Sequence, residues 1–133
     1  MQRRHVLAAG ALAALTGPAG AAGWPAAPIK LIYNFAPGGP GDAVARHLAE
    51  QLTPRLGQQV VVDNRTGASG TIGILAAARA PADGYTLLFT SLPGVVQMPW
   101  SSAEKNFDPV RALQPIAVVG TAPLVILAHP SVP

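Results

Sequence analysis

Short apolar runs alternate along the chain with stretches whose apolar residues recur at helical spacing. The run from Ile29 to Tyr33 is rich in β-branched and aromatic residues and is stopped by prolines and glycines, which predicts a strand. Residues 42–56 carry apolar side chains three and four positions apart, which predicts a helix that ends with Gly57 as its C-terminal cap. Three valines at 60–62 predict a second strand, of the continuous apolar kind found when both faces of a sheet are covered.

The second half of the chain continues this alternation. Residues 71–80 are rich in alanine and predict a second helix, and residues 85–90 predict a third strand after a turn. Residues 92–114 show no periodicity, which predicts a loop that contains short helical turns or acts as a lid. The apolar runs 115–120 and 124–128 predict two further strands. The predicted fold class is therefore α/β, with a mostly parallel sheet of four or five strands and flanking helices.

The N-terminus predicts an export signal peptide that covers residues 1–22. A basic start with Arg3 and Arg4 precedes an apolar run at 6–16, and small residues with an Ala-x-Ala at 19–21 follow. The run has eleven residues, whereas a helix that spans a bilayer needs about 20. This pattern is typical of a cleaved signal, and the paired arginines favour the twin-arginine route to the periplasm, although the general route also accepts such a start.

Charge and composition exclude several kinds of partner. The 133-residue chain has a net charge of +3, but two of its nine basic residues lie in the predicted signal, so the remainder carries seven basic and six acidic residues. No basic patch is interleaved with aromatic residues, so no nucleic-acid partner is predicted. The chain has no cysteine, and His5, His47 and His129 lie far apart in the sequence, so no metal site or other cofactor is predicted.

Two glycine-rich turns, residues 34–42 and 64–70, each join a predicted strand to a predicted helix. Glycines let the backbone approach a ligand closely, and the first turn of a helix has unsatisfied N–H groups and a dipole that favours negative charge. Both turns follow the carboxyl ends of strands, where open α/β sheets bind ligands. The pattern predicts an anion site, in particular for a carboxylate. The alternative is a pair of tight structural turns, the first of them capped by Asp42 as the helix N-cap.

The same turns allow two enzymatic interpretations. Gly39–Gly41 and Asp63 match part of a dinucleotide-binding fingerprint, but Val44 stands where that fingerprint has its third glycine. Ser69 and Ser91 are candidate nucleophiles of a serine hydrolase, but the sequence around Ser69 is one residue short of Gly-x-Ser-x-Gly, and no histidine is placed to act as its base. The sequence therefore favours a binding protein over an enzyme.

The order of the motifs resembles that of the tripartite tricarboxylate transporter substrate-binding proteins, also called the Bug family or TctC-like extracytoplasmic solute receptors. The resemblance is carried by residues 25–42, 60–70, 81–88 and 107–110, and it extends from about Trp24 to the end of the chain. Several motifs in the family's order are a more specific signal than either glycine turn alone.

The resemblance implies one lobe of a periplasmic, two-lobed α/β protein that closes on a small organic acid and delivers it to a membrane permease. In such proteins the matching turns and the end of the third strand hold the ligand carboxylates, largely through backbone N–H groups and ordered water. The matching positions of this chain are Phe35, Ala36, Gly38, Gly39, Gly41, Gly67, Ala68, Ser69 and Ser91. Gly41 stands where the family usually has Ser or Thr, and Thr66 and Ser69 replace a proline and a glycine, which affects the identity of the ligand rather than the binding mode.

Members of this family are much longer than this chain. Residues 23–133 are therefore interpreted as an incomplete first lobe, with the second lobe missing. The alternative to a working receptor is a truncated, non-functional remnant. The sequence does not select among dicarboxylates, tricarboxylates and acidic amino acids as ligands, because recognition through backbone groups leaves little trace in the side chains.

Overall fold

The computed structural model describes residues 23–101, 107–123 and 125–131 of the chain. The predicted signal peptide, residues 1–22, lies outside the described residues. The strand and helix bounds below refer to the described part only.

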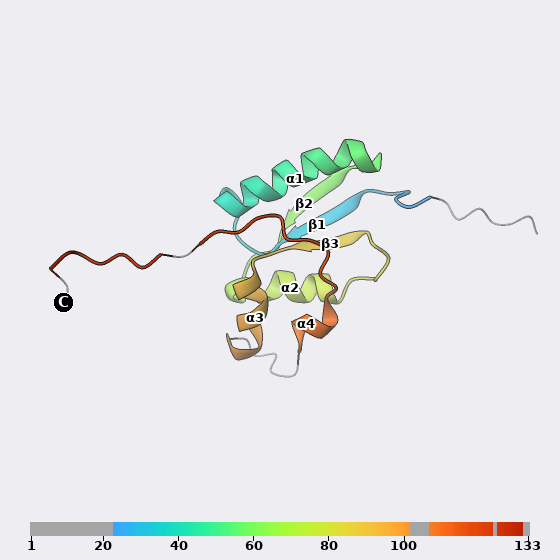
Figure 1. Cartoon of the computed structure of the whole chain (residues 1–133). Coiled ribbons are helices and arrows are strands. Elements are labelled where there is room, and N and C mark those ends of the chain that lie inside the picture. Colours follow the sequence, from blue (N-terminus) through green and yellow to red (C-terminus); the bar gives the residue numbers. More distant parts are fainter. Residues whose placement is uncertain (1–22, 102–106, 124, 132–133) are drawn as a thin grey trace, which may run out of the picture.

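The centre of the molecule is a parallel three-stranded sheet. Its strands are β1 (Ile29–Tyr33), β2 (Val60–Asn64) and β3 (Thr86–Phe89), in the order β2-β1-β3 (Figure 1). Tyr33 at the end of β1 is paired with Asn64 on one side and with Phe89 on the other. The carboxyl ends of all three strands therefore lie level at one edge of the sheet.

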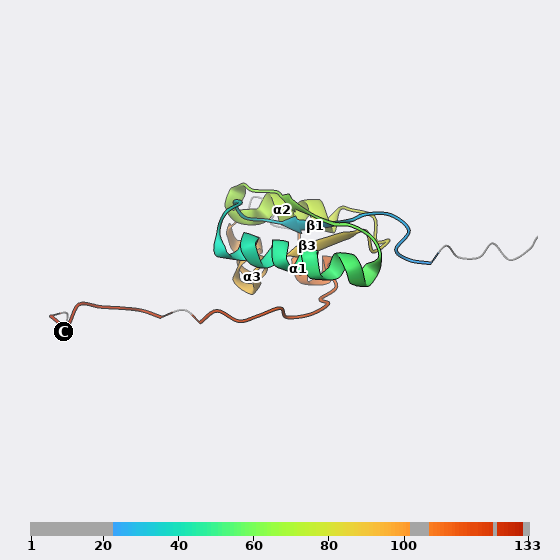
Figure 2. The ribbon, with the colours of Figure 1, turned by 90° about the horizontal axis from the view of Figure 1, so that it is seen from above.

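Helices cover both faces of this sheet. α1 (Pro40–Leu56) follows β1 and lies on one face, whereas α2 (Thr71–Ala78) follows β2 and lies on the opposite face (Figure 2). A 3₁₀ turn, η1 (Ala68–Gly70), leads into α2, and α3 (Leu92–Ser101) and α4 (Pro109–Ala112) follow β3. This alternation around a parallel sheet confirms the predicted α/β class. In the part of the chain that the structure describes, no helix has the length and apolar character needed to span a membrane.

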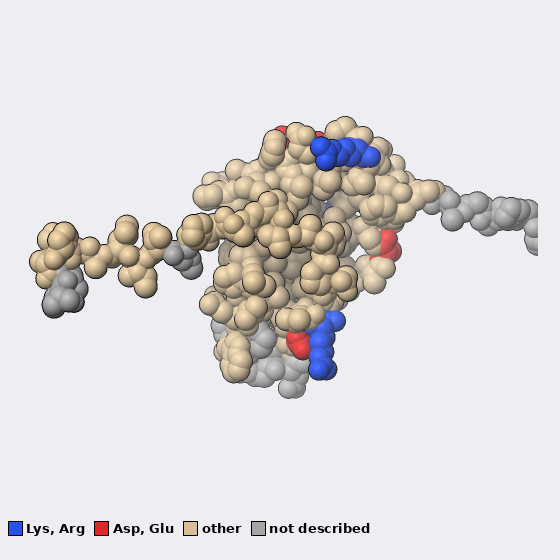
Figure 3. All heavy atoms as spheres, viewed as in Figure 1, with Lys and Arg blue, Asp and Glu red and all other residues tan. Residues whose placement is uncertain are grey.

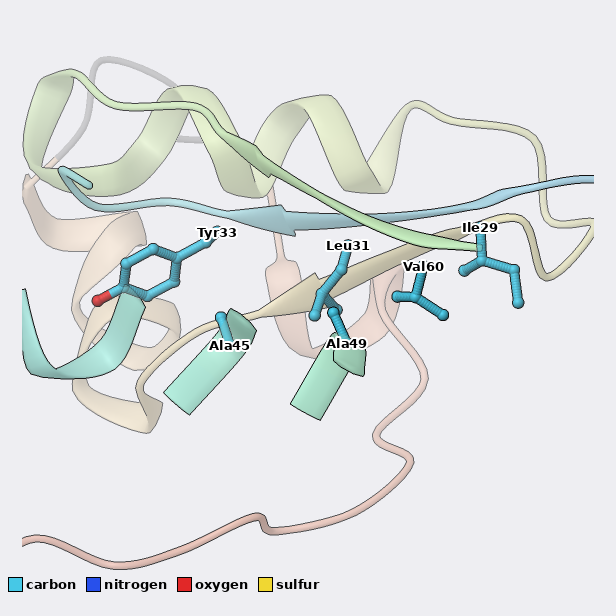
Figure 4. Packing of buried hydrophobic residues seen from close by; sticks show 6 residues of the cluster. All are labelled: Ile29, Leu31, Tyr33, Ala45, Ala49 and Val60. Atoms are coloured by element: carbon cyan, nitrogen blue, oxygen red, sulfur yellow. The ribbon is translucent and has the colours of Figure 1, made fainter. Parts of the chain in front are cut away.

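The face of the sheet beneath α1 holds the main hydrophobic cluster. Every second residue of β1 points to this face, where it packs against α1 and β2. The cluster consists of Ile29, Leu31, Tyr33, Ala45, Ala49 and Val60 (Figure 4). The two alanines are small, so α1 lies close to the strands, and its first turn is held beside the end of β1.

The opposite face of β1 packs against α2. Ile32 and Asn34 point to this side, and Ile74 of α2 has no exposed surface. A Cβ on Gly73 would lie 2.6 Å from the Cβ of Asn34 and 2.8 Å from the carbonyl oxygen of Arg65. Glycine at position 73 therefore allows the backbone of α2 to lie directly on the end of β1.

The prediction of a fourth and a fifth strand is wrong for the described residues. Residues 115–120 and 125–128 form no strand, and Leu124 lies outside the described residues. The side chains of Ile116 and Ile126 are exposed, and the segment extends away from the body of the molecule (Figure 1). Strand preference reflects packing and pairing with neighbours rather than an intrinsic property of the backbone. None of the described helices and strands covers the side chains of residues 115–120 and 125–128.

Residues 92–114 contain more helix than the absence of periodicity predicted. α3 and α4 form in this segment, which confirms the expected helical turns. Asp108 is the N-cap of α4, because its carboxylate accepts hydrogen bonds from the N–H groups of Val110 at 3.0 Å and Arg111 at 3.3 Å.

Candidate functional site

The two glycine turns lie side by side at the carboxyl edge of the sheet. The Asn64 Nδ2 group, at the end of β2, donates a hydrogen bond of 3.4 Å to the carbonyl oxygen of Phe35 in the first turn. The Asn34 Nδ2 group, at the end of β1, donates a hydrogen bond of 3.4 Å to the carbonyl oxygen of Gly70 in the second turn. Each turn is thus tied to the neighbouring strand, which brings the candidate ligand-binding residues together at one edge.

The first turn is organised by Asp42, although not from the position that the sequence suggested. The N-cap of α1 is Gly39, which has no side chain to cap the helix, and Asp42 lies three residues further on. The assignment of Asp42 as the N-cap is therefore wrong. Its carboxylate still holds the turn, because Oδ2 accepts hydrogen bonds from the Gly38 N–H at 3.0 Å and from Arg46 Nε at 2.9 Å. Oδ1 accepts a further bond from Asn64 Nδ2 at 2.8 Å.

These donors stabilise the charged form of Asp42. The hydrogen bond from Arg46, together with those from the Gly38 N–H and the Asn64 amide, lowers the pKa of Asp42 from 3.8 to about 2. The Asp42 side chain is 6% exposed, and Arg46 forms an ion pair with it. The negative charge of Asp42 is therefore matched by an adjacent positive charge, which reduces its repulsion of an anion at the same turn.

The first turn of α1 retains backbone donors without partners. The Ala43 N–H donates to the Gly39 carbonyl oxygen at 3.1 Å, and the Gly38 N–H is taken by Asp42. The N–H groups of Gly39, Gly41 and Asp42 donate no hydrogen bond to any residue that the structure describes. The Gly38 N–H is therefore not available to a ligand, whereas the N–H groups of Gly39, Gly41 and Asp42 have no partner among the described residues.

The second turn has an unusual backbone. Four consecutive residues have positive φ angles, namely Gly67 at 121°, Ala68 at 45°, Ser69 at 56° and Gly70 at 91°. Ala68 and Ser69 carry side chains, and non-glycine residues rarely adopt this region. Such strained backbone conformations are concentrated at ligand-binding and catalytic sites.

This conformation leaves further N–H groups unpaired. The Gly70 N–H donates to the Gly67 carbonyl oxygen at 2.9 Å, and the Thr71 N–H donates to Ala68. The N–H groups of Ala68 and Ser69 have no hydrogen-bond partner within the described ranges. Both residues are exposed, so their donors are accessible at the edge of the sheet.

A third helix, α3, begins at the same edge, and its start was not predicted. The carbonyl oxygen of Ser91, just after β3, accepts a hydrogen bond from the Val95 N–H at 3.3 Å. A Cβ on Gly94 would lie 3.4 Å from Ser91 Oγ and 3.7 Å from the ring of Phe35. Ser91 and Phe35 therefore both lie beside Gly94 in the first turns of α3. The sequence signal for this start is a serine followed by Pro93, a combination favoured at helix N-termini.

The candidate site residues differ in their exposure. Ala36, Gly38, Gly67, Ala68, Ser69 and Ser91 are exposed, and Phe35, Gly39 and Gly41 are half-buried. Charged side chains are sparse on the face of the molecule in Figure 3, and no broad basic patch is visible there. At the edge itself, Arg46 and Arg65 are each paired with a carboxylate, that of Asp42 and that of Asp63, so the unpaired donors of the described residues there are mainly backbone groups.

Sequence reasoning missed four side chains that shape this edge. Asn64 joins β2 to the first turn, and Asn34, which is 1% exposed, joins β1 to the second. Asn34 Oδ1 and Thr90 Oγ1, at the ends of β1 and β3, are buried without a hydrogen-bond partner in the described structure. Tyr33 places its ring beneath the first turn of α1 (Figure 4). A polar residue directly after an apolar strand was the available signal for both asparagines.

The geometry does not assemble a catalytic centre from the described residues. His47 lies 4.0 Å from Glu50 on the exposed side of α1, and His129 contacts Ser131, so neither histidine is hydrogen-bonded to Ser69 or Ser91. The described residues contain no group of three or more potential metal ligands. The arrangement offers hydrogen-bond donors and a helix dipole, which suit anion binding.

Comparison with known proteins identifies the family. Residues 44–133 match the sequence profile described as "Tripartite tricarboxylate transporter family receptor", which covers more than half of the chain. The chain belongs to this family. It is 42% identical over 121 residues to the protein BugT of Bordetella pertussis, covering 90% of this chain and 37% of BugT. It is 40% identical over 124 residues to a UPF0065 protein of Bordetella bronchiseptica, covering 92% of this chain and 37% of that protein.

A solved structure shows the same fold. A protein of R. palustris, whose structure is described as a complex with adipate, superposes with a TM-score of 0.51 and 42% sequence identity. The superposition covers 54% of this chain and 24% of that protein. The chain thus spans little more than a third of the length of the curated relatives that it matches.

The family membership decides between the classes of function. Tripartite tricarboxylate transporter receptors are substrate-binding proteins and not enzymes. The interpretation as a binding protein is therefore confirmed at the level of the family, and the dinucleotide-enzyme and serine-hydrolase interpretations are set aside.

Proposed function

We propose that the chain is part of a periplasmic solute-binding receptor and that the carboxyl edge of its sheet binds a carboxylate group of a small organic acid. The observation that carries this proposal is the set of unpaired backbone donors in two adjacent turns of a chain from a receptor family. These donors are the N–H groups of Gly39, Gly41, Asp42, Ala68 and Ser69. The positive φ angles of residues 67–70 set the backbone conformation of the second turn, in which the Ala68 and Ser69 N–H groups have no partner.

The chemistry of these donors supports a carboxylate as the ligand group. Backbone N–H groups at the start of a helix form charge-assisted hydrogen bonds with anions, and the helix dipole adds to the attraction. The R. palustris relative was solved with adipate, which is a dicarboxylate. A linear dicarboxylate is therefore the first ligand class to test on this chain.

The expected affinity of this edge alone is low. One helix N-terminus stabilises an anion by up to about 2 kcal/mol in a partly buried site. Two such termini contribute roughly 4 kcal/mol, which corresponds to a dissociation constant of about 1 mM. Tighter binding needs further contacts and exclusion of water, which a second lobe of a two-lobed receptor would supply.

The remaining parts of the proposal concern export and transport. Residues 1–22 act as the export signal, with Arg3 and Arg4 directing the chain to the twin-arginine route, and residues 23–133 contribute the first lobe. The bound acid passes to the membrane component of a tripartite transporter. The family name and the signal-like N-terminus support this part.

Calorimetric titration of the chain with adipate tests the proposal. Hexane-1,6-diol, which has the same carbon chain without the charges, serves as the matched control at equal ionic strength. We expect saturable heat with adipate at a dissociation constant of about 1 mM and none with the diol.

Two results would contradict the proposal. Equal heats for adipate and the diol would mean that the carboxylates are not recognised, as expected for a non-functional remnant. Micromolar affinity would mean that this edge is sufficient without a second lobe, and the energetic argument would be wrong.

A further inference from the structure

The hydroxyl of Tyr33 lies against the first turn of α1. Tyr33 is the last residue of β1 and is 8% exposed, and its ring packs with Phe35 and Phe89 at centroid distances of 5.7 and 5.8 Å. The ring extends along the sheet toward the start of α1, with the hydroxyl at its tip (Figure 4). A Cβ built on Gly41 would overlap the Tyr33 Oη atom. The phenol therefore occupies the space that a side chain at position 41 would take.

Tyr33 and Gly41 form a matched pair. A Cβ at position 41 would collide with the phenol, so a larger residue there would need the Tyr33 side chain to move, whereas the backbone angle of Gly41 would itself accept a side chain. In this chain the side chain at 41 is absent, and a hydroxyl reaches the same place from β1.

The described residues show no hydrogen bond of the Tyr33 hydroxyl, and its oxygen is not among the fully buried polar atoms that lack a partner, so solvent reaches it. The ring of Tyr33 is buried while its oxygen is accessible, so the hydroxyl can meet an external acceptor. The N–H groups of Gly41 and Asp42, in the first turn of α1 that Tyr33 lies against, also donate no hydrogen bond to a described residue. The start of α1 thus holds a phenolic O–H and two backbone N–H groups that lack an acceptor.

We propose that Tyr33 is a ligand-binding and specificity-determining residue, whose phenolic O–H donates a hydrogen bond to a carboxylate oxygen at the first turn of α1. The inference rests on the proposed function, since it assigns a side-chain donor to the same carboxylate site. Gly41 then has a defined role, which is to leave room for the phenol.

The surroundings keep this donor in its protonated form. Burial, and to a lesser degree the Asp42 charge, raises the pKa of Tyr33 above its ordinary value. The Asp42 carboxylate is occupied by Arg46, Gly38 and Asn64, so it does not compete strongly for the phenol. The hydroxyl therefore remains available to an external acceptor at neutral pH.

Removal of the hydroxyl tests the proposal. Tyr33→Phe keeps the ring in the core and deletes only the O–H group. The matched control is Tyr85→Phe, because the Tyr85 hydroxyl accepts a hydrogen bond from the Ala26 N–H at the opposite end of the sheet. With adipate as the probe, we expect Tyr33→Phe to weaken binding about tenfold and Tyr85→Phe to leave it unchanged, as for the loss of one hydrogen bond to a charged group.

A spectroscopic measurement separates direct contact from a structural effect. In the chain labelled with ¹³C-tyrosine, adipate should shift the Cζ signal of Tyr33 and leave that of Tyr85 in place. The double variant Tyr33→Val/Gly41→Ser moves the hydroxyl from position 33 to position 41. It should bind adipate more tightly than Tyr33→Val alone, provided that both variants give cooperative thermal unfolding.

The outcomes distinguish this inference from the proposed function. If the wild-type chain binds no adipate, the proposed function fails and the inference fails with it. If the wild-type chain binds adipate, but Tyr33→Phe binds equally well and the Tyr33 Cζ signal does not move, only the assignment of Tyr33 is overturned.

Discussion

Asp42 connects the first turn to both α1 and β2 through a single carboxylate. Its acceptors are filled by the Gly38 N–H, Arg46 and Asn64, which lie in three different segments of the chain. The sequence indicated that Asp42 supports this turn, but it placed Asp42 at the N-cap of α1, which is Gly39. Pro40 was the informative residue, because proline is accepted at the first position of a helix and makes Gly39 the N-cap.

The lowered pKa of Asp42 predicts a loss of stability in acid. Because the folded-state value of about 2 lies below the ordinary 3.8, the charged form stabilises the folded state above pH 4. This contribution is lost as the pH falls from about 4 to about 2. We expect Asp42→Asn to lower the melting temperature at pH 7 by about 5 °C, and the difference from wild type to disappear near pH 2.

Thermal unfolding between pH 2 and pH 7 measures this effect. Glu50→Gln is the control, because Glu50 lies on the same helix with its side chain 75% exposed. An Asp42→Asn variant whose melting temperature follows that of wild type at every pH would show that the charge of Asp42 contributes nothing to stability.

The left-handed backbone at Ser69 predicts a second residue-scale effect. At φ of 56°, glycine is tolerated without strain, whereas a β-branched side chain is strongly disfavoured. We expect Ser69→Gly to raise the free energy of unfolding by up to about 1 kcal/mol and Ser69→Val to lower it by more than about 1 kcal/mol. Urea denaturation of the two variants gives the comparison, and equal stabilities would exclude the strained conformation.

At the scale of elements, the sequence predicted those parts that carry regular patterns. β1, β2, β3, α1 and α2 were predicted because their apolar residues recur at strand or helix spacing. α3 was not located, because Pro93 and Gly94 interrupt its periodicity and its position depends on contacts with Phe35 and Ser91. The side-by-side placement of the turns was expected from the parallel sheet, but the hydrogen bonds of Asn34 and Asn64 that join them were not.

The packing of α2 on β1 makes Gly73 a sensitive position. A Cβ there would lie 2.8 Å from the Arg65 carbonyl oxygen and within 3 Å of the Asn34 backbone, neither of which can move without shifting the turns. We expect Gly73→Ala to lower the free energy of unfolding by about 1–3 kcal/mol, the usual cost of overpacking.

The matched control for this prediction is Gly39→Ala. A Cβ at Gly39 would have its nearest neighbour at 4.0 Å, and the φ angle of −81° suits alanine. Denaturant unfolding that shows the same stability for both variants would contradict the close approach of α2 to β1.

At the scale of the whole molecule, the failed prediction concerns residues 115–128. Their apolar character predicted strands, yet the described residues of this segment lie exposed in the structure. An apolar pattern shows that a segment can bury its side chains, but it does not show which other segment packs against them. The chain spans about 37% of the length of these curated relatives, and none of the described helices and strands covers this segment.

The central claim is that backbone donors of two turns, at one edge of the sheet, receive a carboxylate. A residue-resolved ¹H–¹⁵N NMR titration of the chain with adipate tests this claim most directly. We expect the amide signals of Gly39, Gly41, Asp42, Ala68 and Ser69 to shift together, with half-saturation at about 1 mM, while the Gly38 amide shifts less because Asp42 holds it. Shifts spread evenly over the surface, or confined to residues outside both turns, would contradict the claim.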